Sequence, residues 1–591
     1  MRHLDKIYFF GRWALFFGAI GIVAGLGAVL FQYLCELGMH YFLDLMAGYR
    51  PPKPAGEGHL LPASTTEFNR WILLFLPAAG GIISGWLVYT FAPEAEGHGT
   101  DSAIDAYHNK KGIVRGRIPV IKTLASAITL TTGGSGGREG PIAQIGAGFG
   151  SFMATKLKLS NRERRIMLAA GIGAGVGSIF RAPLAGALFS AEVLYRDPEM
   201  EAEVVIPAGI ASVVGYCVFC MFFGWGTLFQ APEFSFDNPL TLGPYTVLAF
   251  LLAGMGFIYV FFFYKVQDVF RAWKIPNHLK PAVGGILTGM IGFYFPHTLA
   301  FGYGYIQNAL SGDISVYLLL TLALGKILTT GFTIGSGGSG GVFGPSVVIG
   351  GALGGIVGQI FHRIMPGVVT QPEAFIVVGM AGFFAGVSNT PISTIIFISE
   401  MTSSYNLLLP SLLVCSLTYV LSTKWTIYIK QPKNRIASAA HAGDFFINVL
   451  EQIKVRDLKD KIYPAVLVPE YMTFKQFKEL LSGTEQRYFC VVDKSNRMKG
   501  IFSSTDLRGV LFEPSLNEVL LMGDLAKPEV IYVTGEEDLN SVMRKFTRKN
   551  IDALPVVEAH DRQKVLGMLN RRAVIDYYNR RVGELRTEAE T

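Results

Sequence analysis

The glycine-rich segment Thr131–Pro141 holds one carboxylate, Glu139, between two strongly apolar stretches. Four glycines precede Glu139, so the segment carries little bulk and exposes backbone N–H groups. Pro141 suits the first turn of a new helix, where a missing N–H costs nothing. At membrane depth such a turn persists only where it lines a cavity or is buried in protein. The next helix would direct partial positive charge into that cavity, so the segment predicts an anion site containing Glu139.

Two roles for Glu139 are open. As a movable gate, its ionised carboxylate competes with the anion for the amides, and protonation lets it swing out and open the path. In the alternative, Glu139 is fixed in a salt bridge to Arg138 or another base. The glycine-rich setting favours the gate. Its exposed backbone amides bind an anion through partial charges and still let it leave.

The elements that position this segment are apolar helices. Half of the 591 residues are hydrophobic and 16% are charged, which excludes an ordinary soluble protein. Before about residue 440, some apolar stretches reach the roughly 20 residues that span a bilayer and others fall short, as tilted or re-entrant helices do. The 68 glycines fit close packing and broken helices. We expect a polytopic α-helical protein in a lipid bilayer.

Charge and cysteine content exclude several other functions. The net charge of +7 is small for this length and indicates no nucleic-acid partner. Cys217 and Cys220 have C-x-x-C spacing, but they lie in an apolar run without a second ligand pair. They predict packing rather than a zinc or redox site. We expect a transport protein with no metal site, not an enzyme.

Basic loops orient the chain. They are expected on the cytoplasmic side, together with the N-terminus and the C-terminal tail, of a multi-pass protein of the plasma (inner) membrane. These loops are Asn109–Arg117, Lys156–Arg165, Lys265–Lys280 and Lys424–Arg435.

The apolar region contains an internal repeat. Gly137–Pro141 is matched by Gly341–Pro345, each after a Gly/Ser-rich turn, and Pro183–Glu192 resembles Pro391–Glu400. Two halves broken at corresponding points place a substrate site at their interface. The alternative is that the glycine turns only permit close packing.

From about Ile453 the chain becomes richer in charge and alternates short strand and helix patterns, as an α/β region does. This tail is also duplicated. Its matching buried-strand patterns are Tyr488–Asp493 and Ala553–Glu558.

On these motifs the sequence resembles the CLC family of chloride channels and chloride/proton antiporters, with Gly-Arg-Glu-Gly-Pro at 137–141 and Gly-Val-Phe-Gly-Pro at 341–345. The tail resembles a tandem CBS pair. The resemblance implies a homodimer with one chloride pathway per subunit and an inverted repeat of about 18 tilted and broken helices. It implies a transmembrane domain at 1–443, a linker with the first CBS domain at 444–521, and the second CBS domain with the C-terminal tail at 522–591.

The resemblance also implies site residues. The family's gating glutamate falls on Glu139. The amides of Val342 and Phe343 would hold the central anion, and amides around Arg138 and Gly140 would face an outer site.

Two further positions carry over. The family's coordinating tyrosine falls on Tyr428, although a slip of one residue would select Ile427 instead. Lys122 matches a buried lysine that adds positive potential.

The first departure from the family lies at Gly97–Asp101, where the family has G-S-G-I-P. His98 takes the place of the anion-coordinating serine, with Thr100 nearby. An imidazole N–H could donate to an anion, and an imidazolium would bind it more strongly as pH falls. Alternatively, His98 turns aside and a backbone amide substitutes.

The second departure concerns protons. Glu192 matches the first of two adjacent glutamates found in many antiporters, and Val193 stands at the proton-transfer position. Valine carries no proton. This favours a passive, voltage- or pH-gated chloride channel. A proton-coupled chloride/H+ antiporter is the alternative, because some exchangers of the family lack this glutamate.

The CBS resemblance implies an adenine nucleotide such as ATP or AMP. In the first copy Asp506 takes the position that holds the ribose hydroxyls, with Ser503 and Thr505 as further partners. In the second copy that position is Ala573, so the half-site is impaired. The alternative is a structural tail that supports dimerisation.

Overall fold

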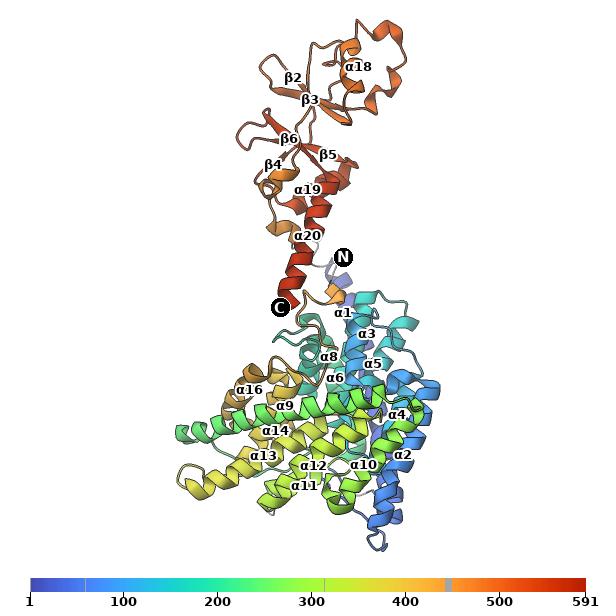
Figure 1. Ribbon diagram of the computed structural model, residues 1–591, viewed down its shortest axis with the longest axis vertical. Helices are drawn as coiled ribbons and strands as arrows, with labels where there is room; N and C mark the ends of the chain where they lie inside the picture. Colours follow the sequence, from blue (N-terminus) through green and yellow to red (C-terminus); the bar gives the residue numbers. More distant parts are fainter. Residues whose placement is uncertain (1, 59, 313, 442–448, 591) are drawn as a thin grey trace. The chain divides into compact units, whose positions relative to one another are not determined.

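A computed structural model describes residues 2–58, 60–312, 314–441 and 449–590. It consists of two compact units, Met1–Arg435 and Ile436–Thr591. The expected domain boundary between residues 443 and 444 lies outside the described residues. The first unit is built from helices α1–α16, and the second contains both sheets (Figure 1).

The helices of the first unit are mostly continuous with the apolar stretches of the sequence. They are α1 (Arg2–Gly38), α2 (Arg70–Phe91), α3 (Thr100–His108), α4 (Ile118–Thr131), α5 (Glu139–Lys156), α6 (Asn161–Ile179), α7 (Pro183–Glu192), α8 (Ala202–Phe223), α9 (Leu242–Ala272), α10 (Lys280–Tyr294), α11 (Tyr303–Leu310), α12 (Val316–Gly335), α13 (Phe343–Ile364), α14 (Ala374–Ser388), α15 (Pro391–Thr402) and α16 (Leu408–Ser422).

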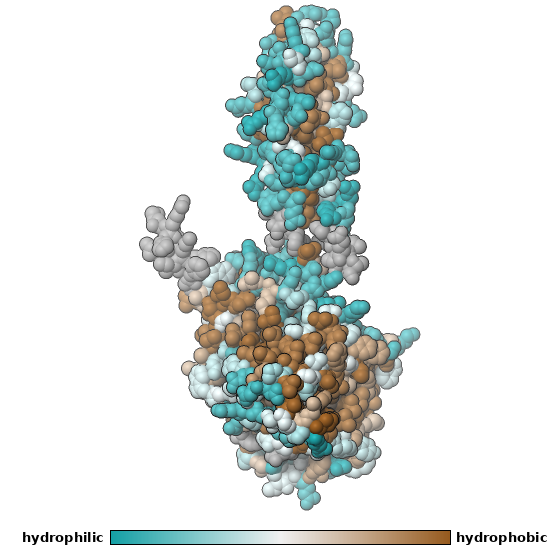
Figure 2. Space-filling view, turned by 90° about the vertical axis from the view of Figure 1, so that its left-hand side faces the viewer, coloured by the Kyte–Doolittle hydropathy of each residue, from teal (hydrophilic) through white to brown (hydrophobic). Residues whose placement is uncertain are grey.

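The surface of this unit suits a bilayer. Within the described residues, seven helical segments are long and apolar enough to span a membrane, and shorter apolar helices accompany them. Many large hydrophobic side chains on these helices are exposed, and Figure 2 shows them as a broad hydrophobic area on one face. The expected many-helix membrane fold is confirmed.

The internal repeat is visible in reciprocal contacts between α7 and α15. The Glu192 carboxylate at the end of α7 accepts the Ser393 N–H at 2.7 Å, in the first turn of α15. The Glu400 carboxylate, near the end of α15, accepts the Ala185 N–H at 2.8 Å in the first turn of α7. Each carboxylate therefore satisfies N–H groups that the other helix leaves open.

Two buried lysines are related in the same way. Lys122 of α4 donates to the Gly97 carbonyl at 2.7 Å, and Lys326 of α12 donates to the Ala300 carbonyl at 2.5 Å. Each also donates to the carbonyl two residues earlier, at 3.0 Å and 3.3 Å respectively. The segments before α3 and α11 are thus held alike in both halves.

The two glycine turns meet inside the unit. Gly137 and Gly341 exchange backbone hydrogen bonds, both at 2.8 Å. Helix α5 begins at Glu139 and α13 at Phe343, directly after these paired residues. Both helix N-termini therefore lie at one place, as the matched motifs predict.

The second unit contains two similar three-stranded sheets. In each, the first strand pairs parallel to the second and the second pairs antiparallel to the third. The strands are β1 (Leu467–Pro469), β2 (Tyr488–Val492), β3 (Met498–Ser503), β4 (Val533–Thr534), β5 (Ala553–Val557) and β6 (Val565–Asn570). The helices include α18 (Phe474–Ser482), α19 (Leu539–Lys549) and α20 (Arg571–Glu590).

Each copy has its own apolar core, and a third cluster joins the copies through their sheets. The register shifts at the same place in both, after Val491 and after Val556. This shared irregularity confirms the duplication of the tail.

Candidate functional site

The Glu139 carboxylate lies on the backbone amide that the sequence assigns to the central anion. The Phe343 N–H, at the start of α13, donates to Glu139 Oε1 at 2.5 Å. Oε2 is buried and has no hydrogen-bond partner among the described residues. Glu139 is only 2% exposed, so its carboxylate is buried against this amide.

Glycines make room for this carboxylate. A Cβ atom at Gly137 would lie 2.1 Å from Glu139 Oε2, and one at Gly341 would lie 2.1 Å from Oε1. A Cβ atom at Gly140 would lie 1.9 Å from the His98 carbonyl oxygen. The three glycines are therefore required by close approach, and Gly140 brings the start of α5 next to the segment that contains His98.

His98 lies beside Tyr428, as the family pattern implies. Their ring centroids are 5.5 Å apart. The Tyr428 hydroxyl is fully buried and has no hydrogen-bond partner among the described residues. An anion at this place would satisfy it, because phenolic O–H groups donate to anions.

The backbone around Tyr428 is fixed by contacts that no local pattern predicted. The Ile427 N–H donates to the Val387 carbonyl at 2.7 Å, and the Tyr264 hydroxyl donates to the Ile427 carbonyl at 2.6 Å. Ile427 is also buried, but its side chain offers no donor. Tyr428 is therefore the chemically suitable residue of the two.

Asp101 is a further residue that sequence reasoning did not single out. Its Oδ2 lies 3.3 Å from His98 Nε2, while His98 Nδ1 is buried without a hydrogen-bond partner among the described residues. The three-residue spacing between His98 and Asp101, at the start of α3, is the sequence feature that could have indicated this pair.

Val193 is buried at the end of α7 and is surrounded by fixed groups. Its carbonyl accepts from Gln431 Nε2 at 3.0 Å, and the same amide nitrogen donates to the Ser388 carbonyl at 3.0 Å. The Gln431 side-chain oxygen, Oε1, accepts from the Thr426 hydroxyl at 2.9 Å. A carboxamide does not titrate, and the carboxylate of the adjacent Glu192 is held by the Ser393 N–H.

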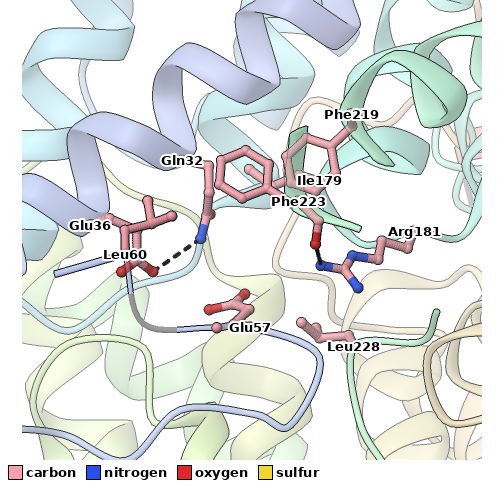
Figure 3. A pocket seen from close by; sticks show the side chains of 10 residues that line it. Gln32, Glu36, Glu57, Leu60, Ile179, Arg181, Phe219, Phe223 and Leu228 are labelled. Atoms are coloured by element: carbon pink, nitrogen blue, oxygen red, sulfur yellow. Dashed lines mark hydrogen bonds between the residues drawn. The ribbon is translucent and has the colours of Figure 1, made fainter. Parts of the chain in front are cut away.

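Arg138 pairs with a partner other than Glu139. Its guanidinium lies 2.5 Å from Glu57 Oε1 and also donates to Gln32, and it stacks on the Phe301 ring at 4.9 Å from the centroid. Glu57 and Gln32 line a pocket with Glu36 (Figure 3). The proposed Arg138–Glu139 salt bridge is not formed, and Glu139 keeps an unpaired oxygen.

In the tail, Asp506 follows β3 as expected and already has several partners. Its Oδ2 accepts from the Ser503 N–H at 2.8 Å and from the Ser503 hydroxyl at 2.7 Å, and Oδ1 lies 2.5 Å from Lys527 Nζ. Partial burial would raise the pKa of Asp506, but the Lys527 and Ser503 contacts outweigh it and lower the pKa. Thr505 is exposed. A nucleotide would have to exchange these contacts for its ribose.

Comparison with known proteins agrees with both units. Residues 80–423 match the family described as voltage gated chloride channel, and residues 455–513 and 522–580 each match the CBS domain. CBS domains bind adenine nucleotides in many proteins.

Curated relatives carry names of two kinds. A putative chloride channel protein, ClcB-like, of Ralstonia nicotianae is 28% identical over 68% of this chain and 92% of its own. The H(+)/Cl(-) exchange transporter ClcA of Vibrio vulnificus is 29% identical over 68% of this chain and 84% of its own.

Solved structures share the fold. A slow cyanobacterial Cl-/H+ antiporter aligns with a TM-score of 0.63 at 22% identity, over 71% of this chain and 96% of its own. A eukaryotic CLC transporter aligns with a TM-score of 0.56 at 18% identity, over 96% of this chain and 98% of its own. The chain therefore belongs to the voltage-gated chloride channel family, a family of anion transporters, and carries two CBS domains.

Proposed function

We propose that the protein exchanges chloride for protons across the membrane. In this proposal the Glu139 carboxyl either occupies the anion site in its ionised form or carries a proton. One observation carries this proposal: the carboxylate accepts the Phe343 N–H inside a site where Val342, Phe343 and Tyr428 are all buried. A buried site whose anion position is taken by a carboxylate suits stepwise exchange better than a continuously open pore.

The exchange follows from competition at the amides. Ionised Glu139 and chloride are both anions, so they compete for the Phe343 N–H and for the positive ends of α5 and α13. A protonated carboxyl loses the charge-assisted hydrogen bond and yields the site to chloride. Each chloride that enters therefore favours a proton on Glu139, which couples the two movements.

The names of relatives support this proposal in part. The Vibrio vulnificus relative is named an H(+)/Cl(-) exchange transporter, and the cyanobacterial structure is of a Cl-/H+ antiporter. A passive channel is the second candidate, since Val193 replaces the proton-transfer carboxylate and the Ralstonia nicotianae relative is named a putative channel.

Electrodes for chloride and for pH in one liposome suspension test the proposal. With an outward chloride gradient and no proton gradient, we expect protons to enter the vesicles as chloride leaves, against an opposing pH gradient as it builds up. The ionophore valinomycin with potassium controls the voltage. Chloride efflux without proton movement would contradict exchange and favour the channel.

We also propose that the protein is a homodimer in the plasma (inner) membrane, with the basic loops and the tail on the cytoplasmic side. The basic loop between α3 and α4, at Asn109–Arg117, supports this orientation by the positive-inside rule.

For the tail we propose an adenine nucleotide at the first CBS copy. ATP or AMP titrated into the full-length protein should release heat, and Asp506→Ala should weaken the affinity about tenfold or more, because a hydrogen bond to a charged group contributes roughly 1.5–3 kcal/mol. Asp561→Asn, at an exposed aspartate paired with Arg497, is the control and should bind normally. If the wild-type protein releases no heat, the nucleotide proposal is contradicted and the structural role of the tail is favoured.

A further inference from the structure

His98 and Asp101 form a pair that runs from the buried site toward water. The His98 side chain is 7% exposed and the Asp101 side chain is 17% exposed, with 3.3 Å between Nε2 and Oδ2. Asp101 Oδ1 also accepts the Lys430 N–H at 3.1 Å. Asp101 is thus fixed at the edge of the site, on the side of the basic segment that contains Lys430.

The opposite edge of the imidazole faces inward. Nδ1 is buried and has no hydrogen-bond partner among the described residues, and the ring packs against the rings of Tyr428 and Phe263. The His98 backbone lies against Gly140, the residue after Glu139. One nitrogen therefore points to a carboxylate near water, while the other is buried without a hydrogen-bond partner among the described residues.

We propose that His98 and Asp101 carry the proton between Glu139 and the cytoplasmic side, in place of the carboxylate that is missing at Val193. This inference rests on the proposed proton exchange. The protonated Glu139 carboxyl gives its proton to the imidazole, which becomes an imidazolium. The imidazolium then gives a proton to Asp101 or to water beside it. Only N–H and O–H bonds change, so the transfer needs no further reactant.

Imidazole suits this step because it takes up and releases protons at physiological pH, and because its two nitrogens can accept and release on opposite sides. Asp101 lies beside the ring, and the Lys122 Cε would lie 3.0 Å from a Cβ at Gly99. The other titratable and charged groups near the pair include Lys122, Glu139, Tyr264, Tyr428 and Lys430.

At Val193, the backbone carbonyl accepts from the Gln431 carboxamide, which is fixed by three hydrogen bonds and cannot titrate.

The test measures proton and chloride fluxes together in liposomes containing full-length protein. Asp101→Asn keeps the size of the side chain and removes its charge, and His98→Gln removes the titratable ring. We expect the ratio of protons to chloride to fall at least about tenfold in both variants, as loss of a positioned acid or base does. Asp105→Asn is the matched control on the same helix, because Asp105 pairs with Lys110 rather than with His98.

Chloride binding, measured by calorimetry on the same purified proteins, separates proton transfer from anion binding. Support requires that Asp101→Asn loses proton flux while its chloride affinity stays within a few-fold of wild type. If both variants keep the wild-type ratio, or if both lose chloride binding along with proton flux, the inference is overturned. Wild-type protein that moves chloride without protons would instead overturn the proposed exchange, and the relay with it.

Discussion

Glu139→Gln is expected to abolish chloride-driven proton movement and to remove the pH dependence of chloride flux. Glutamine keeps the size of the side chain but cannot carry a proton, and its neutral amide competes poorly with chloride for the Phe343 N–H. We expect proton flux to fall by about a hundredfold or more, as loss of a positioned proton carrier does. Chloride flux should continue and become nearly constant across pH. The measurement is the two-electrode liposome assay at several pH values.

Glu203→Gln is the matched control for this variant. Glu203 is an exposed carboxylate of α8 that pairs with Arg162, so its loss should leave both fluxes unchanged. A Glu139→Gln protein that kept the wild-type pH profile would contradict the role of Glu139 as gate. Glu139 would then be a fixed structural residue.

The sequence predicted the two helix breaks because short local patterns determine them. Glycines that permit close approach and a proline in the first turn specify where α5 and α13 begin, and both helices start where these motifs predict. The repetition of the pattern predicted that the breaks meet, and Gly137 and Gly341 are hydrogen-bonded to each other.

The partners of the charged groups were not predictable in this way. Arg138 pairs with Glu57, which lies 81 residues earlier in the chain within a loop that has no periodic pattern. His98 and Asp101 are only three residues apart, but their contact depends on Gly99, whose φ of 84° turns the chain into α3. Such contacts follow from tertiary placement, which a single sequence does not specify.

Element boundaries also differed. The basic segment Lys265–Lys280 was expected as a loop, but α9 continues to Ala272. Lys, Gln and Arg favour helix as much as most apolar residues do, so a helix extends past the apolar stretch that defines a membrane span. Tyr428 was expected near a last membrane helix, and it lies shortly after α16 ends at Ser422, in a segment without regular helix.

The repeat leads to a second large expected effect, at Lys326. Sequence comparison drew attention to Lys122 alone, but Lys326 holds the corresponding carbonyls of the other half. Lys122→Met and Lys326→Met should therefore destabilise the protein to a similar extent. Each removes a buried lysine that donates two hydrogen bonds, while the Ala95, Gly97 and Thr298 carbonyls keep other donors. We therefore expect a loss of about 1.5–3 kcal/mol in each variant, the contribution of a hydrogen bond to a charged group.

Chloride transport should weaken in both variants as well. Each variant removes a buried lysine that donates hydrogen bonds to the segment before α3 or before α11. Ala300 and Gly302 precede α11 just as Gly97 and Gly99 precede α3, and both glycines have a positive φ, 85° and 84°. Thermal unfolding in detergent and chloride flux at several chloride concentrations measure the two effects. Lys265→Met, at an exposed position of α9, is the control.

The comparison between the two lysines decides what the repeat contributes. If Lys326→Met behaved like Lys265→Met while Lys122→Met lost stability and transport, the second half would be a scaffold, and the two ends of the pathway would not be equivalent. Equal losses would instead mean that each half fixes one entrance to the site with the same buried cation. The gate would then be the main difference between the halves, because the Glu139 carboxylate of the first half accepts the Phe343 N–H of the second half.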